Sequence, residues 1–213
     1  MRIFSLLPLL AIATLLSACG GPGGAQSVPS ASQYAGAANA SQSQATNAGA
    51  IKPSVNANYS CTASALGRSI WSAVVTGTTP GSVPHGGKVS MSGFQATVTI
   101  PGSIVNKLIG MGITAVTMEA TVLDVNSTDA KPTTVNAAKK PFSFGPVTLQ
   151  KNMGAVFFLP PTPITIGTWT ALKAGTMVFT TGNVKLVLTS SKAPVKVTCS
   201  PKPSVTLSTT TVS

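Results

Sequence analysis

Residues 94–100 read FQATVTI, and this stretch decides the fold class. Its apolar side chains alternate with polar ones, in the order Phe94, Gln95, Ala96, Thr97, Val98, Thr99 and Ile100. A period of two places the two sets on opposite faces of an extended strand, so that one face can be buried while the other meets water. The stretch therefore predicts a half-buried β-strand, which needs further strands beside it.

The same alternation occurs on both sides of this stretch, at residues 71–75, 116–122, 177–179, 184–188 and 195–199. Gly182-Asn183 lies between two such runs and predicts a tight hairpin turn. Clusters of Pro and Gly interrupt the chain at residues 79–81, 84–87 and 160–163. Many short strands with frequent turn signals favour an all-β fold, an antiparallel β-sandwich.

One segment departs from the period of two. In residues 103–110, SIVNKLIG, the apolar side chains fall at positions 104, 105, 108 and 109, which is the spacing of one helix face. Ser103 stands where an N-cap would, and Gly110 stands where a helix would end. The pattern predicts one or two helical turns at an end of the sandwich, and its β-branched residues leave a strand as the alternative.

Residues 1–18 predict a signal peptide. Arg2 supplies a positive charge, and residues 3–16 are mostly apolar but fewer than the roughly 20 that span a bilayer. The sequence Leu16-Ser17-Ala18-Cys19 resembles the lipobox of bacterial lipoproteins. This resemblance implies a lipoprotein with acyl chains such as palmitate on Cys19, and two or three such chains anchor a protein stably. The alternative is an ordinary secretory signal with a coincidental Cys.

The sequence predicts three further regions. Residues 19–56 begin with the predicted lipidated Cys and consist of Gly, Ala, Ser, Gln, Asn and similar residues, with Lys52 as the only charge. Such a composition buries too little apolar surface to offset its ordering entropy, so it predicts a disordered tether. The β-sandwich domain is expected over residues 57–203, and a C-terminal tail over residues 204–213.

Cys61 and Cys199 stand near the two ends of the predicted strand region. If Cys19 is lipidated, these two remain, and an exported, oxidising context favours a disulfide between them. A redox-active pair would more often have Cys-x-x-Cys spacing. The disulfide would place the first and last strands side by side.

Three stretches resemble those of one family: YSCT at 59–62, MSGFQATVTIP at 91–101 and VKVTCSP at 195–201. They are similar to the Ig-like secreted domain of unknown function found in actinobacterial surface proteins, over roughly residues 57–203. The resemblance implies an Ig-like β-sandwich, a disulfide between the ends of the domain and display at the cell surface. It brings no catalytic residues. This chain departs from the family in its strongly basic charge and in its single copy behind a lipobox.

The composition argues against most enzyme classes. Fourteen Lys and Arg stand against three acids, Glu119, Asp124 and Asp129, and one His, His85. Because metal sites and acid–base catalysis need clustered carboxylates, His or Cys, we expect no metal, no cofactor and no enzymatic activity. His85 is expected in a turn, with a general base that activates a Ser as the alternative. Residues 124–129 are interpreted as a polar turn rather than a calcium loop, because the Gly and the terminal Glu of an EF-hand are missing.

The two Trp residues differ in their surroundings. Trp71 alternates with Ala73 and Val75, which predicts a core position. Trp169 follows a Pro-rich stretch, and both a core position and a platform for sugar rings stay open for it.

The predicted domain is strongly basic. Since only Arg2 and Lys52 precede residue 57, twelve basic side chains and all three acids give the remainder a formal charge of +9. The predicted export argues against a nucleic-acid partner. The candidate anion-binding residues are Lys139 and Lys140, the only adjacent basic pair, and Lys185 and Lys196, on the polar faces of their strands.

Two functions are compatible with these features. The first is a lipid-anchored cell-envelope protein, bound to a bacterial membrane and facing outward or into the periplasm, that displays a non-enzymatic β-sandwich in a structural or adhesive role. The second is a binding module for anionic envelope polymers or lipid headgroups, which a Lys-rich face would attract. A solvated basic face without any ligand is the simpler alternative to the second function.

Overall fold

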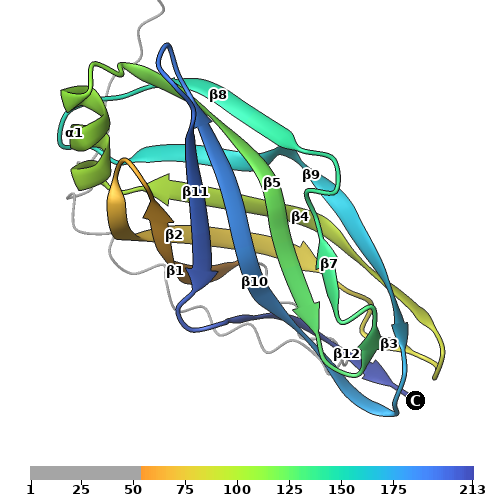
Figure 1. Cartoon of the computed structure of the whole chain (residues 1–213). Coiled ribbons are helices and arrows are strands. Elements are labelled where there is room, and N and C mark those ends of the chain that lie inside the picture. Colours follow the sequence, from red (N-terminus) through yellow and green to blue (C-terminus); the bar gives the residue numbers. More distant parts are fainter. Residues whose placement is uncertain (1–53) are drawn as a thin grey trace, which may run out of the picture. The chain divides into compact units, whose positions relative to one another are not determined.

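The structure is a computed structural model that describes residues 54–213 (Figure 1). The predicted signal peptide, the predicted lipidation site Cys19 and the predicted tether up to residue 53 lie outside the described residues.

The described residues form twelve strands and one helix. The strands are β1 (Val55–Ala63), β2 (Gly67–Thr78), β3 (Ser82–Val83), β4 (Lys88–Ile100), β5 (Ala115–Ser127), β6 (Ala130–Lys131), β7 (Thr134–Asn136), β8 (Phe142–Thr148), β9 (Ala155–Ala171), β10 (Gly175–Thr189), β11 (Val195–Pro201) and β12 (Thr206–Val212). The helix α1 (Gly102–Gly110) connects β4 to β5. The predicted all-β fold class with one short helix is therefore confirmed.

All twelve strands belong to one sheet. Its main path runs β3–β12–β10–β11–β1–β2–β4–β9–β6, while β5 pairs with β10 and in turn carries β7 and β8. The 15-residue strand β10 is long enough to pair with β12 near its beginning, β11 near its end and β5 along most of its length. The pairing of β12 with β3 is parallel, and the other pairings are antiparallel.

The sheet folds over on itself into two layers that enclose the core. Figure 1 shows β5, β10 and β11 lying across β1, β2 and β4. Alternate side chains of both layers point inward, and the 94–100 stretch of β4 has Phe94, Ala96, Val98 and Ile100 buried, as the sequence pattern predicts. Trp71 is buried on β2, which confirms its predicted core position.

The two layers are continuous through β1 and β11, and a disulfide joins these strands. Cys61 and Cys199 lie directly opposite each other in the antiparallel register, with their Cα atoms 4.0 Å apart and an S–S bond of 2.08 Å. The bond thus fixes the line along which the sheet passes from one layer to the other.

The opposite margin of the folded sheet is open. No backbone pairing joins β8 to β9 in the part of the chain that the structure describes. Phe144 of β8 packs edge-on against Phe157 and Phe158 of β9, with ring centroids 6.4 and 5.3 Å away. Prolines, which have no N–H to donate to a ladder, stand on both strands at Pro146, Pro160, Pro161 and Pro163. We call this β8–β9 junction the seam; aromatic packing holds it instead of backbone hydrogen bonds.

The helix α1 agrees with the predicted apolar face but not with the predicted cap. The buried face of the helix consists of Ile104, Val105 and Leu108. The N-cap residue is Pro101 rather than Ser103, and no side chain caps the first turn. Helical geometry begins earlier than predicted because Pro101, which has an extended ψ of 150°, ends β4 and leads directly into the first turn.

The hairpin predicted at Gly182-Asn183 is wrong. Both residues lie within β10, which continues from Gly175 to Thr189, and the pairing with β5 shifts register there. A Cβ atom on Gly182 would lie 2.7 Å from the Cβ of Asp124 and 2.9 Å from its carbonyl oxygen. The glycine therefore permits a close approach between two strands, not a reversal of the chain.

The structure also differs from the prediction of a C-terminal tail over residues 204–213, because most of these residues form a strand. Residues 206–212 form β12, which pairs with β10 and buries Leu207, Ser208, Thr210 and Val212. Thr210 donates a hydrogen bond to the carbonyl of Pro80 at 2.9 Å. The Thr-rich sequence resembled a polar tail, but β-branched Thr fits a strand when its hydroxyl finds a buried partner.

Replacing Cys61 and Cys199 together by Ala should lower the free energy of unfolding by up to about 5 kcal/mol, because the disulfide closes a segment of 138 residues in the unfolded chain. Denaturant unfolding of the oxidised protein and the double variant measures the difference. Reduction of the unsubstituted protein should produce a comparable shift, which controls for the lost packing of the side chains. Equal midpoints in all three samples would contradict a stabilising role for the disulfide.

Candidate functional site

The structure divides the four candidate anion-binding lysines into two pairs. Lys185 on β10 and Lys196 on β11 are exposed on neighbouring strands: Lys185 lies opposite Thr198, and Lys196 lies opposite Val187. Lys139 and Lys140 lie exposed in the connection between β7 and β8. The two pairs thus belong to different surroundings.

Acidic side chains accompany the pair on β10 and β11. Glu119 of β5 lies opposite Val187, which is the residue that Lys196 faces from the other side. The pKa of the Asp124 carboxyl on β5 is raised because the group is partly buried, and the charge of Lys185 opposes part of that rise. Asp124 therefore offsets part of the charge of Lys185, and Glu119 lies two strands away from Lys196 on the same face of the sheet.

Lys139 and Lys140 lie at a groove that opens where the seam widens. The groove has a volume of about 960 Å³, and we call it the seam groove. One wall comes from β7, β8 and their connection, and the other from β9. Its lining residues are Val135, Asn136, Ala137, Lys139, Lys140, Phe142, Ile164, Thr165, Ile166, Gly167 and Thr168.

Asn136 fixes the connection that carries the two lysines. Its Oδ1 accepts hydrogen bonds from the backbone N–H groups of Leu123 and Ala138, each at 2.9 Å. Its Nδ2 donates to the carbonyl of Thr121 at 3.2 Å. A buried Ala138 completes the attachment of this connection to β5, so Lys139 begins from an anchored backbone.

The opposite wall of the groove rests on Trp169. Its side chain is fully buried and packs edge-on against Phe179, with ring centroids 4.9 Å apart. A Cβ on Gly167, whose φ is +66°, would lie 2.5 Å from the Trp169 ring, so only glycine fits there. Trp169 therefore occupies a core position, and the alternative of an exposed platform for sugar rings is wrong.

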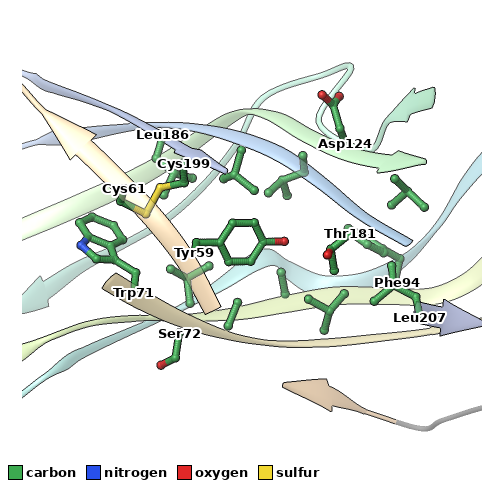
Figure 2. A pocket seen from close by; sticks show the side chains of 17 residues that line it. Tyr59, Cys61, Trp71, Ser72, Phe94, Asp124, Thr181, Leu186, Cys199 and Leu207 are labelled. Atoms are coloured by element: carbon green, nitrogen blue, oxygen red, sulfur yellow. A yellow bond between two sulfur atoms is a disulfide. The ribbon is translucent and has the colours of Figure 1, made fainter. Parts of the chain in front are cut away.

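A second, much smaller cavity lies between the two layers, and Tyr59 is one of its lining residues (Figure 2). Its volume of about 30 Å³ has room for roughly one or two water molecules. Figure 2 shows the Tyr59 ring beside the Cys61–Cys199 disulfide, with its hydroxyl directed toward Thr181. Burial raises the pKa of the Tyr59 phenol to about 12, and a hydrogen bond with the Thr181 side chain opposes that rise.

His85 and the polar stretch at 124–129 have structural partners. The exposed His85 ring donates from Nε2 to the carbonyl of Leu172 at 3.0 Å, and His85 lies in a turn as predicted. Residues 124–127 belong to β5, so only Thr128 and Asp129, whose φ is 49°, lie in the turn that the sequence pattern suggested for the whole stretch. Within residues 54–213, no group of three or more His, Cys, Asp or Glu side chains could hold a metal ion.

No helix of the described residues is both long and apolar enough to cross a membrane.

Comparison with known proteins identifies the family. Residues 58–208 match a family described as "Family of unknown function (DUF6801)". The chain belongs to this family. The predicted resemblance to a domain of unknown function is thus confirmed over nearly the expected residues, whereas the link to Ig-like actinobacterial surface proteins stays a prediction.

One similar solved structure is described as a "putative membrane anchored protein" from Corynebacterium diphtheriae. The TM-score is 0.47 at 18% sequence identity, and the match covers 75% of this chain and 37% of that chain. This member of the DUF6801 family therefore spans well under half the length of that neighbour. A search of the curated proteins finds no match.

The seam groove has no signal in any single stretch of sequence, because its two walls are some thirty residues apart along the chain. The prolines at 160, 161 and 163 are the one local hint, since they mark a strand edge that cannot pair fully. Nothing in the sequence indicated that Lys139 and Lys140 would face that edge.

Raising the pH from 10 to 12 should destabilise the protein through Tyr59. The unfolded chain loses the phenolic proton near pH 10, whereas the folded protein keeps it up to about pH 12. In that window the unfolded state binds fewer protons, so the free energy of unfolding falls with rising pH, by about 2–3 kcal/mol in total.

Urea unfolding at pH 9.5 and 11.5 measures this loss, with Tyr59→Phe as the control. Deprotonation of Lys side chains affects both proteins equally. The difference between their changes in the free energy of unfolding therefore reports the contribution of the Tyr59 phenol. Parallel losses in the two proteins would contradict the assignment.

Proposed function

We propose that this member of the DUF6801 family is a lipoprotein that is anchored through acyl chains on Cys19 and displays a non-enzymatic β-sandwich at the bacterial cell envelope. Its role there is structural or adhesive. The Cys61–Cys199 disulfide is the structural observation that carries the proposal, because disulfides persist in exported proteins and are rare in the cytosol.

Three features of the sequence support the same proposal. The lipobox at residues 16–19 provides an acyl acceptor, and the stretch before it has the composition of a signal peptide. The scarcity of acids and His leaves few groups for acid–base catalysis. Membrane attachment through lipid requires no spanning segment, since two acyl chains hold a protein stably.

Cys19→Ala should move the protein from the membrane fraction to the soluble fraction, because the substitution removes the thiol that accepts the lipid. Cell fractionation with immunodetection measures the distribution. Mass spectrometry of the mature protein provides the complementary measurement and should find a lipid-modified Cys19 as the first residue. A mature protein that begins at another residue would refute the anchor.

A second candidate function is the binding of anionic envelope material at Lys139 and Lys140. The seam groove favours it, because both lysines line a concave surface on which none of the three acids lies. Lys185 and Lys196 are weaker candidates, since Asp124 and Glu119 lie on β5, which is next to the strand of Lys185 and one strand further from Lys196. An envelope polymer with repeated negative charges would be attracted to the first pair more strongly than to the second.

Binding to an acidic polysaccharide should be strong at low salt and collapse between 0.15 M and 1 M salt, because the screening length falls from about 8 Å to about 3 Å. Surface plasmon resonance on the immobilised glycan measures the affinity. Replacement of Lys139 and Lys140 by Gln should weaken binding more than the matched replacement of Lys185 and Lys196. Binding that ignores salt, or no binding at low salt, would contradict an electrostatic site.

A further inference from the structure

The seam groove lies where two strand edges run past each other without pairing. On one side, β7 and β8 pair with β5 and leave their other edges free within the described residues. On the other side, β9 pairs with β4 along its length, while its second edge is paired with β6 at Thr170 and Ala171. The seam is closed by Phe144 near the beginning of β9 and widens into the groove toward Ile164.

The floor of the groove is apolar. Phe142 of β8 and Ile164 of β9 are half-buried and pack against the core, and Ile166 is buried beneath the groove. Val135 of β7 adds a fourth apolar side chain at the wall. A volume of about 960 Å³ with such a floor is in the size range of small-molecule sites, which are typically roughly 300–1,000 Å³.

The charged side chains that line the groove are all positive. Lys139 and Lys140 are the charged residues of its lining, and Asn136 anchors the connection from which both project. A ligand that matches this surface has a negative group for the lysines and an aliphatic part for the floor. An acidic sugar polymer would satisfy the lysines but would leave the apolar floor without a partner.

An added peptide strand fits the groove less well than a lipid. Pro163 has no N–H, and Gly167 has a φ of +66°, so the regular edge of β9 is interrupted on both sides of residues 164–166. Strand addition depends on a run of main-chain hydrogen bonds, and this edge offers too short a run. The recognition therefore comes from side chains.

We propose that the seam groove binds an anionic lipid, with an aliphatic chain over Phe142, Ile164 and Ile166 and the negatively charged head at Lys139 and Lys140. This inference deepens the second function proposed above, on which it rests, by naming the ligand class. It does not depend on lipidation of Cys19, because the groove is formed by residues 135–168.

Calorimetric titration with butyl, octyl and dodecyl phosphate below their micelle concentrations tests the proposal. The suitable protein is the full chain with Cys19→Ala. This variant cannot be lipidated at residue 19, so it needs no detergent even if the natural protein carries acyl chains there. Affinity should rise steeply with chain length, by up to about fourfold for each methylene that becomes fully buried. Dodecyl phosphate should also bind more tightly than dodecanol.

Two variants locate the site. Lys139→Gln with Lys140→Gln should weaken dodecyl phosphate by about tenfold and leave dodecanol binding unchanged, because charge-assisted contacts contribute about 1.4 kcal/mol or more. Ile164→Ser should instead reduce the dependence on chain length. The matched control, Lys185→Gln with Lys196→Gln, removes the same charge elsewhere and should change neither property.

The outcomes separate this inference from the function on which it rests. If butyl and dodecyl phosphate bind equally, or if only the acidic polysaccharide binds, the lipid site is refuted while anion binding stands. If the two lysine variants weaken dodecyl phosphate equally, the ligand is held by general charge and the groove is refuted. If neither phosphates nor polysaccharide bind at low salt, both proposals fail together. The lysine variants decide the result even if Ile164→Ser does not fold.

Discussion

The antiparallel pairing of β1 with β11 is the constraint on which the rest of the fold depends. It brings Cys61 against Cys199, across a separation of 138 residues, and makes one sheet out of what would otherwise be two. The packing of Tyr59 and Trp71 between the layers follows from this closure, because both side chains lie against the strands that the pairing brings together. The covalent bond restricts the unfolded chain, and the pairing decides which faces meet.

The two layers are joined by backbone pairing at β1 and β11, but at the seam between β8 and β9 they are not. A folded sheet would normally remove its last edges by pairing them, which also protects against edge-to-edge association. Here the prolines of β8 and β9 lie where the pairing of these strands with β5 and β4 shifts register, and Phe144 packs against Phe157 and Phe158 in place of a ladder. The seam can therefore widen at its far end without breaking hydrogen bonds. The groove beside Lys139 and Lys140 is a direct consequence of an edge that was never paired.

Local patterns succeeded where burial followed a fixed period. The alternation from Phe94 to Ile100 predicted a strand with one buried face, and the spacing of Ile104 and Leu108 predicted a helix. They failed at Gly182-Asn183, because the same dipeptide that favours a turn also permits a close approach to Asp124 within a continuous strand. Residues 206–212 were missed because Thr is polar in composition, yet in β12 the hydroxyl of Thr210 is satisfied by Thr79 and Pro80, which are distant in sequence.

The sequence by itself determined the alternating parts of β2, β4, β5, β10 and β11, the helix and the pair of cysteines that could bond, since these depend on neighbours along the chain and on residue type. It also determined the excess of positive charge, but it could not rank the lysines, because all four candidates were equally solvated residues. Only the tertiary structure placed the strand of Glu119 and Asp124 next to that of Lys185, and an apolar groove beside Lys139 and Lys140. That difference arises from contacts between strands far apart in sequence, and the electrostatic and apolar surroundings of a side chain are properties of those contacts.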